Sequence, residues 1–215
     1  MVPRGRRPLT AFEQVLLGFV AREPYSGYGL KKVFSASPAS VYQPSPGALY
    51  PALRRLVGRD LLCAEEIVSG GRRPQRLYHV TEAGRVTHLD WLRQPVDPAA
   101  VGSDLGLHLM RFAMMENQLE RAEILAFLKG LAEALDGFVA GMEQYVASGV
   151  QSARRHAQLA LMHGIVVHRA SLDWARSAIS VLAESAAQPL HRPRRSARLL
   201  LRWPVTSAGV DPSGI

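Results

Sequence analysis

The sequence has little of what disulfide-stabilised, membrane-spanning or catalytic proteins need. Its 215 residues include a single cysteine, Cys63, so the chain cannot form an internal disulfide and a reducing compartment is expected. No apolar run is long enough to span a bilayer, and the N-terminus has no signal-peptide core. Gly-rich phosphate loops, nucleophile elbows and motifs of paired acids are also missing. We therefore expect a cytoplasmic protein that is not an enzyme.

The histidines do not have the spacing of metal ligands. His156, His163 and His168 follow one another at intervals of seven and five residues, and neither interval places two imidazoles on adjacent turns of a helix. Ordinary surface or interface histidines are the simpler interpretation. We expect no metal site and no cofactor.

Positive charge is plentiful but unevenly distributed. Lys and Arg number 26 against 18 Asp and Glu, which gives a formal net charge of +8. Residues 1–90 carry a net charge of +6, residues 91–186 carry −2 and residues 187–215 carry +4. A basic first segment joined to a nearly neutral second one indicates a polyanion-binding module beside a module with another role.

Local signals predict two short helices near the N-terminus. Residues 10–13 have the T-x-x-E pattern of a capping box, and an amphipathic pattern follows until Pro24, which ends the helix. Ser26 can cap a second helix, whose outer side carries Lys31 and Lys32. These two helices would form the first part of a small helical DNA-binding core.

The stretch SPGALYPALRRLVGRD, residues 45–60, predicts a third helix. Ser45 suits the N-cap and Pro46 the first helical position, and three leucines then recur at the spacing of one buried face. The opposite face carries Gly47, Pro51, Arg54, Arg55 and Gly58, with Ala48 and Tyr50 beside it near the helix start. Guanidinium groups flanked by small residues suit a phosphate backbone, so we interpret this segment as the recognition helix of a helix-turn-helix. An ordinary amphipathic helix with a solvated basic side is the alternative.

After Asp60 the apolar pattern changes its period. Residues 61–68 and 75–80 read as two strands of a hairpin, and the connection between them is long and contains Arg72 and Arg73. A helix-turn-helix followed by such a hairpin is a winged helix. The arginines at the tip would contact phosphates or enter the minor groove, although a solvated surface loop explains them equally simply without the preceding helices.

The second half of the chain is predicted to be helical. A fourth helix begins at Thr81 and Glu82 and runs to about Arg93, residues 94–103 read as a linker, and Asp104 caps the next helix. A heptad seam then covers residues 124–145, and a last long helix carries a similar stripe over residues 161–182. The combined apolar surface exceeds one antiparallel contact, so we expect a symmetric homodimer. A monomeric helical subdomain that folds on its own N-terminal domain is the alternative.

These patterns divide the chain into four expected parts. They are a flexible basic arm (residues 1–9), a winged helix-turn-helix domain (residues 10–95), a helical, coiled-coil-like dimerisation domain (residues 104–186) and a basic tail that we expect to be disordered (residues 187–215). The expected fold class is mostly α.

Three stretches resemble the PadR-like family of transcriptional regulators, in the subgroup with a C-terminal helical dimerisation domain. They are Ser26-Gly27-Tyr28, SPGALYPALRRL at residues 45–56 and GRRPQRLYHVTEAGR at residues 71–85. Together with the helical half, the resemblance covers roughly residues 9–186. The occurrence of the three motifs in this order is specific, whereas any one of them alone is not.

Three positions bear on how well the resemblance holds. Asp60 stands where the family usually has glycine at a turn that needs a positive φ, and aspartate tolerates that geometry. Leu77 stands where an aromatic residue is common in the wing strand, which is a change of packing. Pro51, which the family carries, removes one hydrogen bond near the start of the recognition helix.

The resemblance implies a repressor that binds a palindromic operator in double-stranded DNA as a homodimer, with half-sites about 34 Å apart. By that analogy, base edges are approached by Ser45, Ala48 and Tyr50, and phosphates are held by Lys31, Lys32, Arg54, Arg55, Arg72 and Arg73. Tyr50 is equally well explained as a core residue with its hydroxyl at the rim.

Several branches of the family also imply a small-molecule effector that releases DNA. Met162, His168 and Trp174 would line such a pocket at the dimer interface, and plain core positions are the alternative interpretation. A different class of function also stays open, because some winged helices are protein-interaction or ligand-binding adaptors that do not read DNA. Basic residues on the third helix and on the wing tip favour DNA, since an adaptor would need an exposed apolar patch there.

Overall fold

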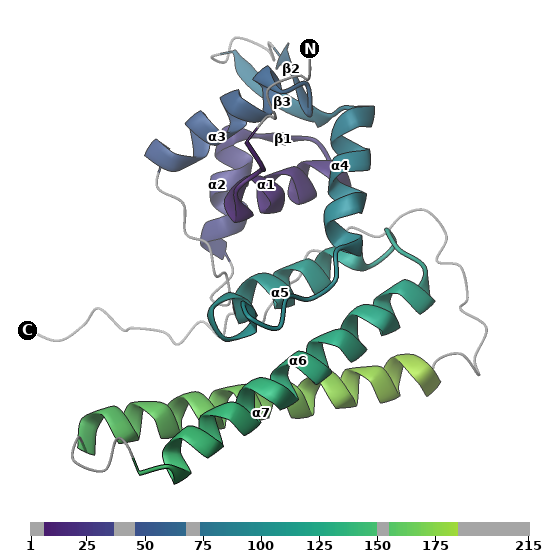
Figure 1. Ribbon diagram of the computed structural model, residues 1–215. Helices are drawn as coiled ribbons and strands as arrows, with labels where there is room; N and C mark the ends of the chain where they lie inside the picture. The colour runs from purple at the N-terminus through teal and green to yellow at the C-terminus, as the bar shows by residue number, and fades with distance from the viewer. Residues whose placement is uncertain (1–6, 37–45, 68–73, 150–154, 185–215) are drawn as a thin grey trace, which may run out of the picture.

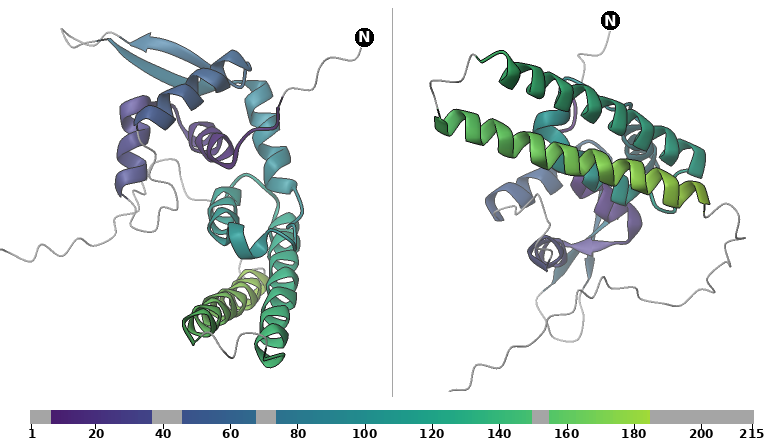
Figure 2. Two further views of the ribbon diagram at one scale, coloured as in Figure 1. Left: turned by 60° about the vertical axis from the view of Figure 1, so that its left-hand side comes forward. Right: turned by 90° about the horizontal axis from the view of Figure 1, so that it is seen from below.

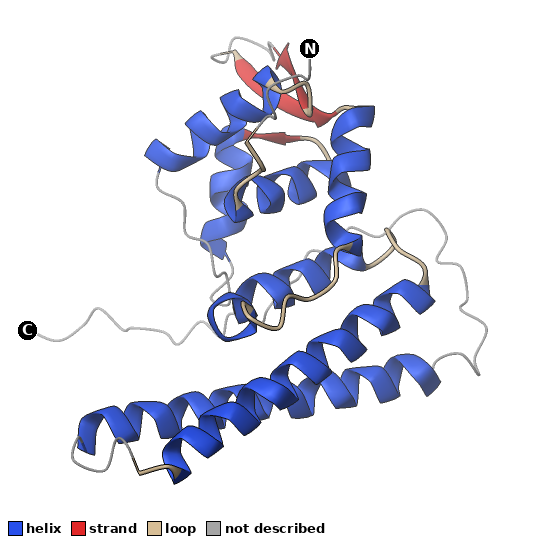
Figure 3. Ribbon diagram, in the orientation of Figure 1, coloured by secondary structure: helices blue, strands red, loops and turns tan. Residues whose placement is uncertain are grey.

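The structure is a computed structural model that describes residues 7–36, 46–67, 74–149 and 155–184. Within these ranges the chain forms seven helices and a small three-stranded sheet (Figures 1 and 3). The elements are α1 (Ala11–Arg22), β1 (Tyr25–Ser26), α2 (Gly27–Ala36), α3 (Pro46–Gly58), β2 (Leu62–Ile67), β3 (Gln75–Val80), α4 (Glu82–Arg93), α5 (Val101–Met115), α6 (Arg121–Ala147) and α7 (Arg155–Glu184). The mostly α fold class is confirmed.

Side-chain caps set the starts of the first two helices, as the sequence predicts. The Thr10 hydroxyl accepts the Glu13 N–H at 3.2 Å, and the Glu13 carboxylate accepts the Thr10 N–H at 2.9 Å. This capping box satisfies two N–H groups that no helical carbonyl reaches. The Ser26 hydroxyl accepts the Gly29 N–H at 3.0 Å at the start of α2.

The sheet forms the wing and one short additional strand. Its order is β1-β3-β2, with both pairs antiparallel, and Leu62 on β2 is opposite Val80 on β3. Asp60 has a φ of 61° in the turn between α3 and β2, which confirms the left-handed geometry expected there. Gly84 is required nearby, because a Cβ at this position would lie 2.0 Å from the Leu61 carbonyl oxygen.

Helix α1 occupies the centre of the N-terminal domain, with α2, α3 and α4 around it (Figures 1 and 2). Leu16 and Leu17 are fully buried and pack with Leu30, Leu53 and other apolar residues of the surrounding helices. A three-helix core followed by the β2–β3 hairpin is a winged helix-turn-helix. Helix α3 lies at the periphery of this core, next to the hairpin.

The C-terminal helices differ from the sequence prediction at one point. Helix α5 begins at Val101, three residues before the predicted cap, and Asp104 lies inside it with non-helical dihedral angles (φ −110°, ψ 16°). Asp104 therefore does not begin α5. The helix is kinked at this residue, after a turn formed by residues 101–103. Helices α6 and α7 are long and pack side by side (Figure 2), and Leu131, Leu135 and Leu172 are among their buried residues. No helix among the described residues is long and apolar enough to cross a membrane.

Candidate nucleic-acid interface

Helix α3 has the two faces that its sequence predicts. Leu49, Leu53 and Leu56 are buried, whereas Arg54 and Arg55 are exposed. Gly47, Ala48, Tyr50 and Gly58 are also exposed. The helix is continuous through Pro51, where the missing N–H removes only one hydrogen bond in the second turn. The predicted cap Ser45 lies outside the described residues.

Helix α2 adds two exposed lysines beside α3. Lys31 and Lys32 are both exposed on α2, and α2 packs against α3 (Figure 1). Two packed helices of this domain therefore both carry exposed basic side chains. Arg72 and Arg73 at the wing tip lie outside the described residues.

Tyr50 of α3 packs on the first residue of α2. The Tyr50 ring lies directly on Gly27, because a Cβ at Gly27 would be 2.5 Å from Tyr50 Cε1. Tyr50 is 43% exposed, so it is a surface residue that packs against α2 and not a core residue with its hydroxyl at the rim. Tyr28, next to Gly27, is 71% exposed, and it is not among the predicted DNA-contacting residues. The Ser26-Gly27-Tyr28 motif was the signal available for it.

A buried carboxylate holds Arg55. The Nε of Arg55 lies 2.6 Å from Oε1 of Glu13, whose side chain is almost completely buried between α1 and α3. Burial raises the pKa of Glu13, but hydrogen bonds from Arg55 and Thr10 outweigh this effect and hold the pKa below its usual value. Arg54 has no hydrogen bond or ion pair to another described residue. The two adjacent arginines therefore differ in how firmly they are held.

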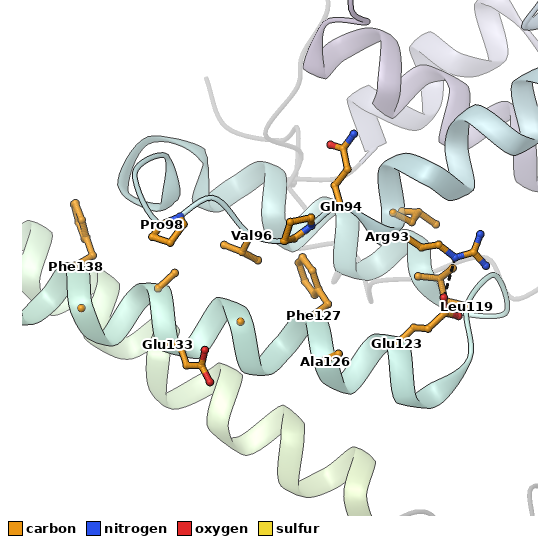
Figure 4. A pocket seen from close by; sticks show the side chains of 15 residues that line it. Arg93, Gln94, Val96, Pro98, Leu119, Glu123, Ala126, Phe127, Glu133 and Phe138 are labelled. Atoms are coloured by element: carbon orange, nitrogen blue, oxygen red, sulfur yellow. Dashed lines mark hydrogen bonds and ion pairs between the residues drawn. The ribbon is translucent and has the colours of Figure 1, made fainter.

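A groove lies on the other side of the molecule, between α6 and the segment that joins α4 to α5 (Figure 4). Its volume is about 840 Å³, and Val96, Phe127 and Phe138 contribute to its apolar lining. The ion pair between Arg93 and Glu123, with Nε and Oε1 2.8 Å apart, closes one end. The groove is large enough for a small apolar molecule.

A buried cation lies behind this groove. The Arg111 guanidinium is stacked on the Phe127 ring, 4.5 Å from its centroid, and donates to the carbonyl of Gln94. Burial lowers the pKa of Arg111 to about 10, so it keeps its charge at neutral pH. No carboxylate pairs with it among the residues described. His108, on the same helix, is also buried, which lowers the pKa of its imidazole.

The three predicted effector residues lie along α7, and none of them lines this groove. Met162 is half exposed, and the His168 ring packs on Phe138 with the centroids 4.8 Å apart. Trp174 makes an edge contact with Phe112 at 5.4 Å. His168 and Trp174 therefore pack on two different aromatic side chains. Within the described ranges, His, Cys, Asp and Glu side chains form no group of three or more that could hold a metal ion.

The comparisons with known proteins find transcriptional regulators. The family model described as "Transcriptional regulator PadR-like family" matches residues 16–88, which begin within α1 and end within α4. This part of the chain, the winged helix, is therefore similar to PadR-like regulators. A probable transcriptional regulator of Mycobacterium tuberculosis is 21% identical to this chain over 187 residues, which are 81% of this chain and 98% of that protein.

Solved structures of PadR-like proteins are also similar. Bacillus subtilis PadR in complex with operator DNA is 16% identical, with a TM-score of 0.40, over 80% of this chain and 99% of that one. The same protein in complex with p-coumaric acid gives a TM-score of 0.37 at 16% identity, over 81% and 99% of the two chains. A PadR family regulator from Eggerthella lenta is 32% identical, with a TM-score of 0.32, over 36% of this chain and 65% of that one.

The packing of Tyr50 on Gly27 is open to a direct test. In the chain with Gly27→Ala, the new Cβ overlaps the far end of the Tyr50 side chain and forces the ring to move. Because Gly27 is buried and the packing of the ring on α2 is lost, we expect the unfolding free energy to fall by about 1 kcal/mol. The Tyr50 ring signals should shift in an NMR spectrum. Gly58→Ala is the matched control, since its Cβ would meet no atom within 4 Å. A much larger loss of stability would show that α2 moves instead of the ring.

Proposed function

We propose that this chain is a PadR-like regulator that represses transcription by binding a palindromic operator in double-stranded DNA as a homodimer. The observation that carries the proposal is the exposed face of α3, which carries Arg54 and Arg55, and its neighbour α2 has exposed Lys31 and Lys32. A helix with a buried leucine face and a basic outer face, next to a wing, has the form that enters a major groove.

The proposed contacts follow the way in which recognition helices of helix-turn-helix proteins dock on DNA. The N-terminal end of α3 would approach the base edges, and its arginines would reach the phosphates on either side. The base-edge residues are Ser45, Ala48 and Tyr50, and the phosphate-binding residues are Lys31, Lys32, Arg54, Arg55, Arg72 and Arg73. Of these, Ser45, Arg72 and Arg73 are proposed from the sequence alone, because they lie outside the described residues.

An adaptor that binds another protein is the alternative function. Such a surface would be centred on exposed apolar side chains, because these supply most of the binding energy at protein interfaces. Among the exposed residues of α3, Tyr50 alone is large and apolar, and Arg54 and Arg55 lie on the same surface. The charge of this face therefore favours DNA.

The proposed dimer rests on an exposed apolar stripe on α7. Leu159, Met162 and Val166 follow at intervals of three and four residues, so they lie on one face of the helix, and Val166 is 66% exposed. A second copy would bury this stripe, at roughly 25 cal/mol for each Å² of apolar surface removed from water. A symmetric pair also supplies one α3 to each half-site of a palindrome.

We also propose that a small molecule bound in the groove beside α6 releases the operator. The apolar lining suits an aromatic body, and the buried charge of Arg111 behind Phe127 favours an anionic group. The groove is bounded by residues of α4 and by the segment leading to α5, so an occupant would bias the position of the winged helix relative to α6.

The DNA-binding proposal predicts different effects for two single charge removals. Arg54→Ala should weaken binding to all duplexes and lower the slope of log affinity against log salt by about 0.9, because one phosphate contact is lost. Lys129→Ala removes the same charge from the exposed surface of α6 and should change neither quantity. Fluorescence anisotropy with the DNA upstream of the gene and with a scrambled duplex, at two salt concentrations, measures both. Equal affinities and slopes for wild type and Arg54→Ala would exclude α3 as the DNA-binding helix.

The dimer proposal predicts that a charge in the α7 stripe separates the subunits. Val166→Glu should convert the dimer into a monomer of 23.6 kDa, because the carboxylate would be buried without a partner. Light scattering after size exclusion measures the mass. Ala160→Glu places the same charge on an exposed position outside the stripe and should leave the dimer intact. A wild-type protein that is already monomeric at micromolar concentration would contradict the proposal.

The effector proposal predicts that filling the groove abolishes the response to ligands. An aromatic carboxylic acid that enters the groove should raise the dissociation constant for DNA in the wild type and alter the fluorescence of Trp91, the buried neighbour of the groove residue Leu92. Gly130 lines the groove and a Cβ there would meet no atom within 4 Å, so Gly130→Leu should place its side chain in the groove and remove both effects while DNA binding persists. If aromatic carboxylic acids raise the dissociation constant for DNA equally in the wild type and in Gly130→Leu, the effector site is not in this groove.

A further inference from the structure

We infer that Glu13, on α1 and outside the DNA-facing surface, is the positioning residue for the recognition helix and sets how well the protein discriminates its operator from other DNA. The inference rests on the proposed DNA-binding function. Glu13 already belongs to the capping box of α1, and positioning α3 is a second role that the capping box does not require.

The Glu13 carboxylate joins two elements through its two oxygens. Oε2 accepts the N–H of Thr10 at the start of α1, and Oε1 accepts the Nε–H of Arg55 on α3 at 2.6 Å. Capping alone would need only the first contact. The second links residues 42 positions apart in the sequence and fixes α3 against α1 at its exposed edge. Because Glu13 is only 3% exposed, water has little access to its carboxylate.

The same bond determines how Arg55 is presented. Nε is one of the donors of a planar guanidinium, so anchoring it fixes the plane in which the two terminal nitrogens lie. The Arg55 side chain remains 52% exposed, and its terminal nitrogens have no hydrogen-bond partner among the described residues. A free arginine must lose rotamer freedom when it binds a phosphate, whereas Arg55 is already ordered in the folded protein.

The Glu13–Arg55 pair and Arg54 contribute to DNA binding in different ways. Together, Glu13 and Arg55 carry no net charge, so they add little to the long-range attraction of DNA. Arg54, which has no ion pair to a described residue, supplies that attraction. An oriented phosphate contact fixes the register of α3 on the duplex, and the register decides whether the base-edge residues meet their bases. Loss of the pair should therefore affect the operator more than random DNA.

The test compares two duplexes, one that the wild-type protein selects from a random-sequence pool and a scrambled version of it. Glu13→Gln should reduce the ratio of the two affinities by about tenfold, the scale of one mismatched base pair, mainly by weakening the selected duplex. Arg55→Lys keeps the charge but not the planar fork, and it should give the same loss. The double variant should lose no more than either single variant, because both changes break one interaction.

Thr10→Ala is the matched control. It removes the hydroxyl that caps α1 but keeps the backbone N–H that Glu13 accepts, so it should lower the thermal midpoint and leave the affinity ratio unchanged. If Glu13→Gln does not fold, Arg55→Lys decides alone, because it leaves the capping box intact. Unchanged ratios in both single variants, or losses that multiply in the double variant, would overturn the inference. A wild-type protein that selects no sequence would overturn the proposed function, and the inference with it.

Discussion

The burial of α1 is the constraint on which the other elements depend. Leu16 and Leu17 are fully buried, and α1 packs against α3 on one side and against α4 and α5 on others. The same helix contributes Gly18, where a Cβ would lie 2.5 Å from the Met114 sulfur of α5. It also contributes Arg22, which donates to the Ala113 carbonyl at 3.2 Å. The helix proposed to read DNA and the helix that leads to the C-terminal pair are therefore held by one central element.

This arrangement gives a physical route between the two ends of the molecule. The groove beside α6 is lined by the end of α4 and by the segment before α5, and both of these helices contact α1. Close packing transmits small displacements, because interiors contain few voids that can absorb them. A ligand in the groove that shifts α5 would thus act on α3 through α1, and the Glu13–Arg55 bond is one polar contact between those two helices.

The sequence predicted the features that short-range signals determine. The capping box at Thr10, the cap at Ser26 and the left-handed turn at Asp60 each depend on residues within a few positions, and the structure contains all three. Strand β1 has only two residues and forms because it pairs with β3, so its own sequence is too short to show the alternating pattern of a strand. The Glu13–Arg55 bond and the groove likewise arise from contacts between distant segments. Periodicity identifies which face of a helix is buried, but not which side chain on another helix it meets.

The central claim is that two copies of α3 read one operator. Hydroxyl-radical footprinting of the complex with a duplex selected by the wild-type protein tests this most directly. The account predicts two protected patches related by two-fold symmetry, with centres about 34 Å or one helical turn apart. Protection in one patch alone would contradict the homodimer on a palindrome, and uniform weak protection would show a basic protein that binds DNA without reading its sequence.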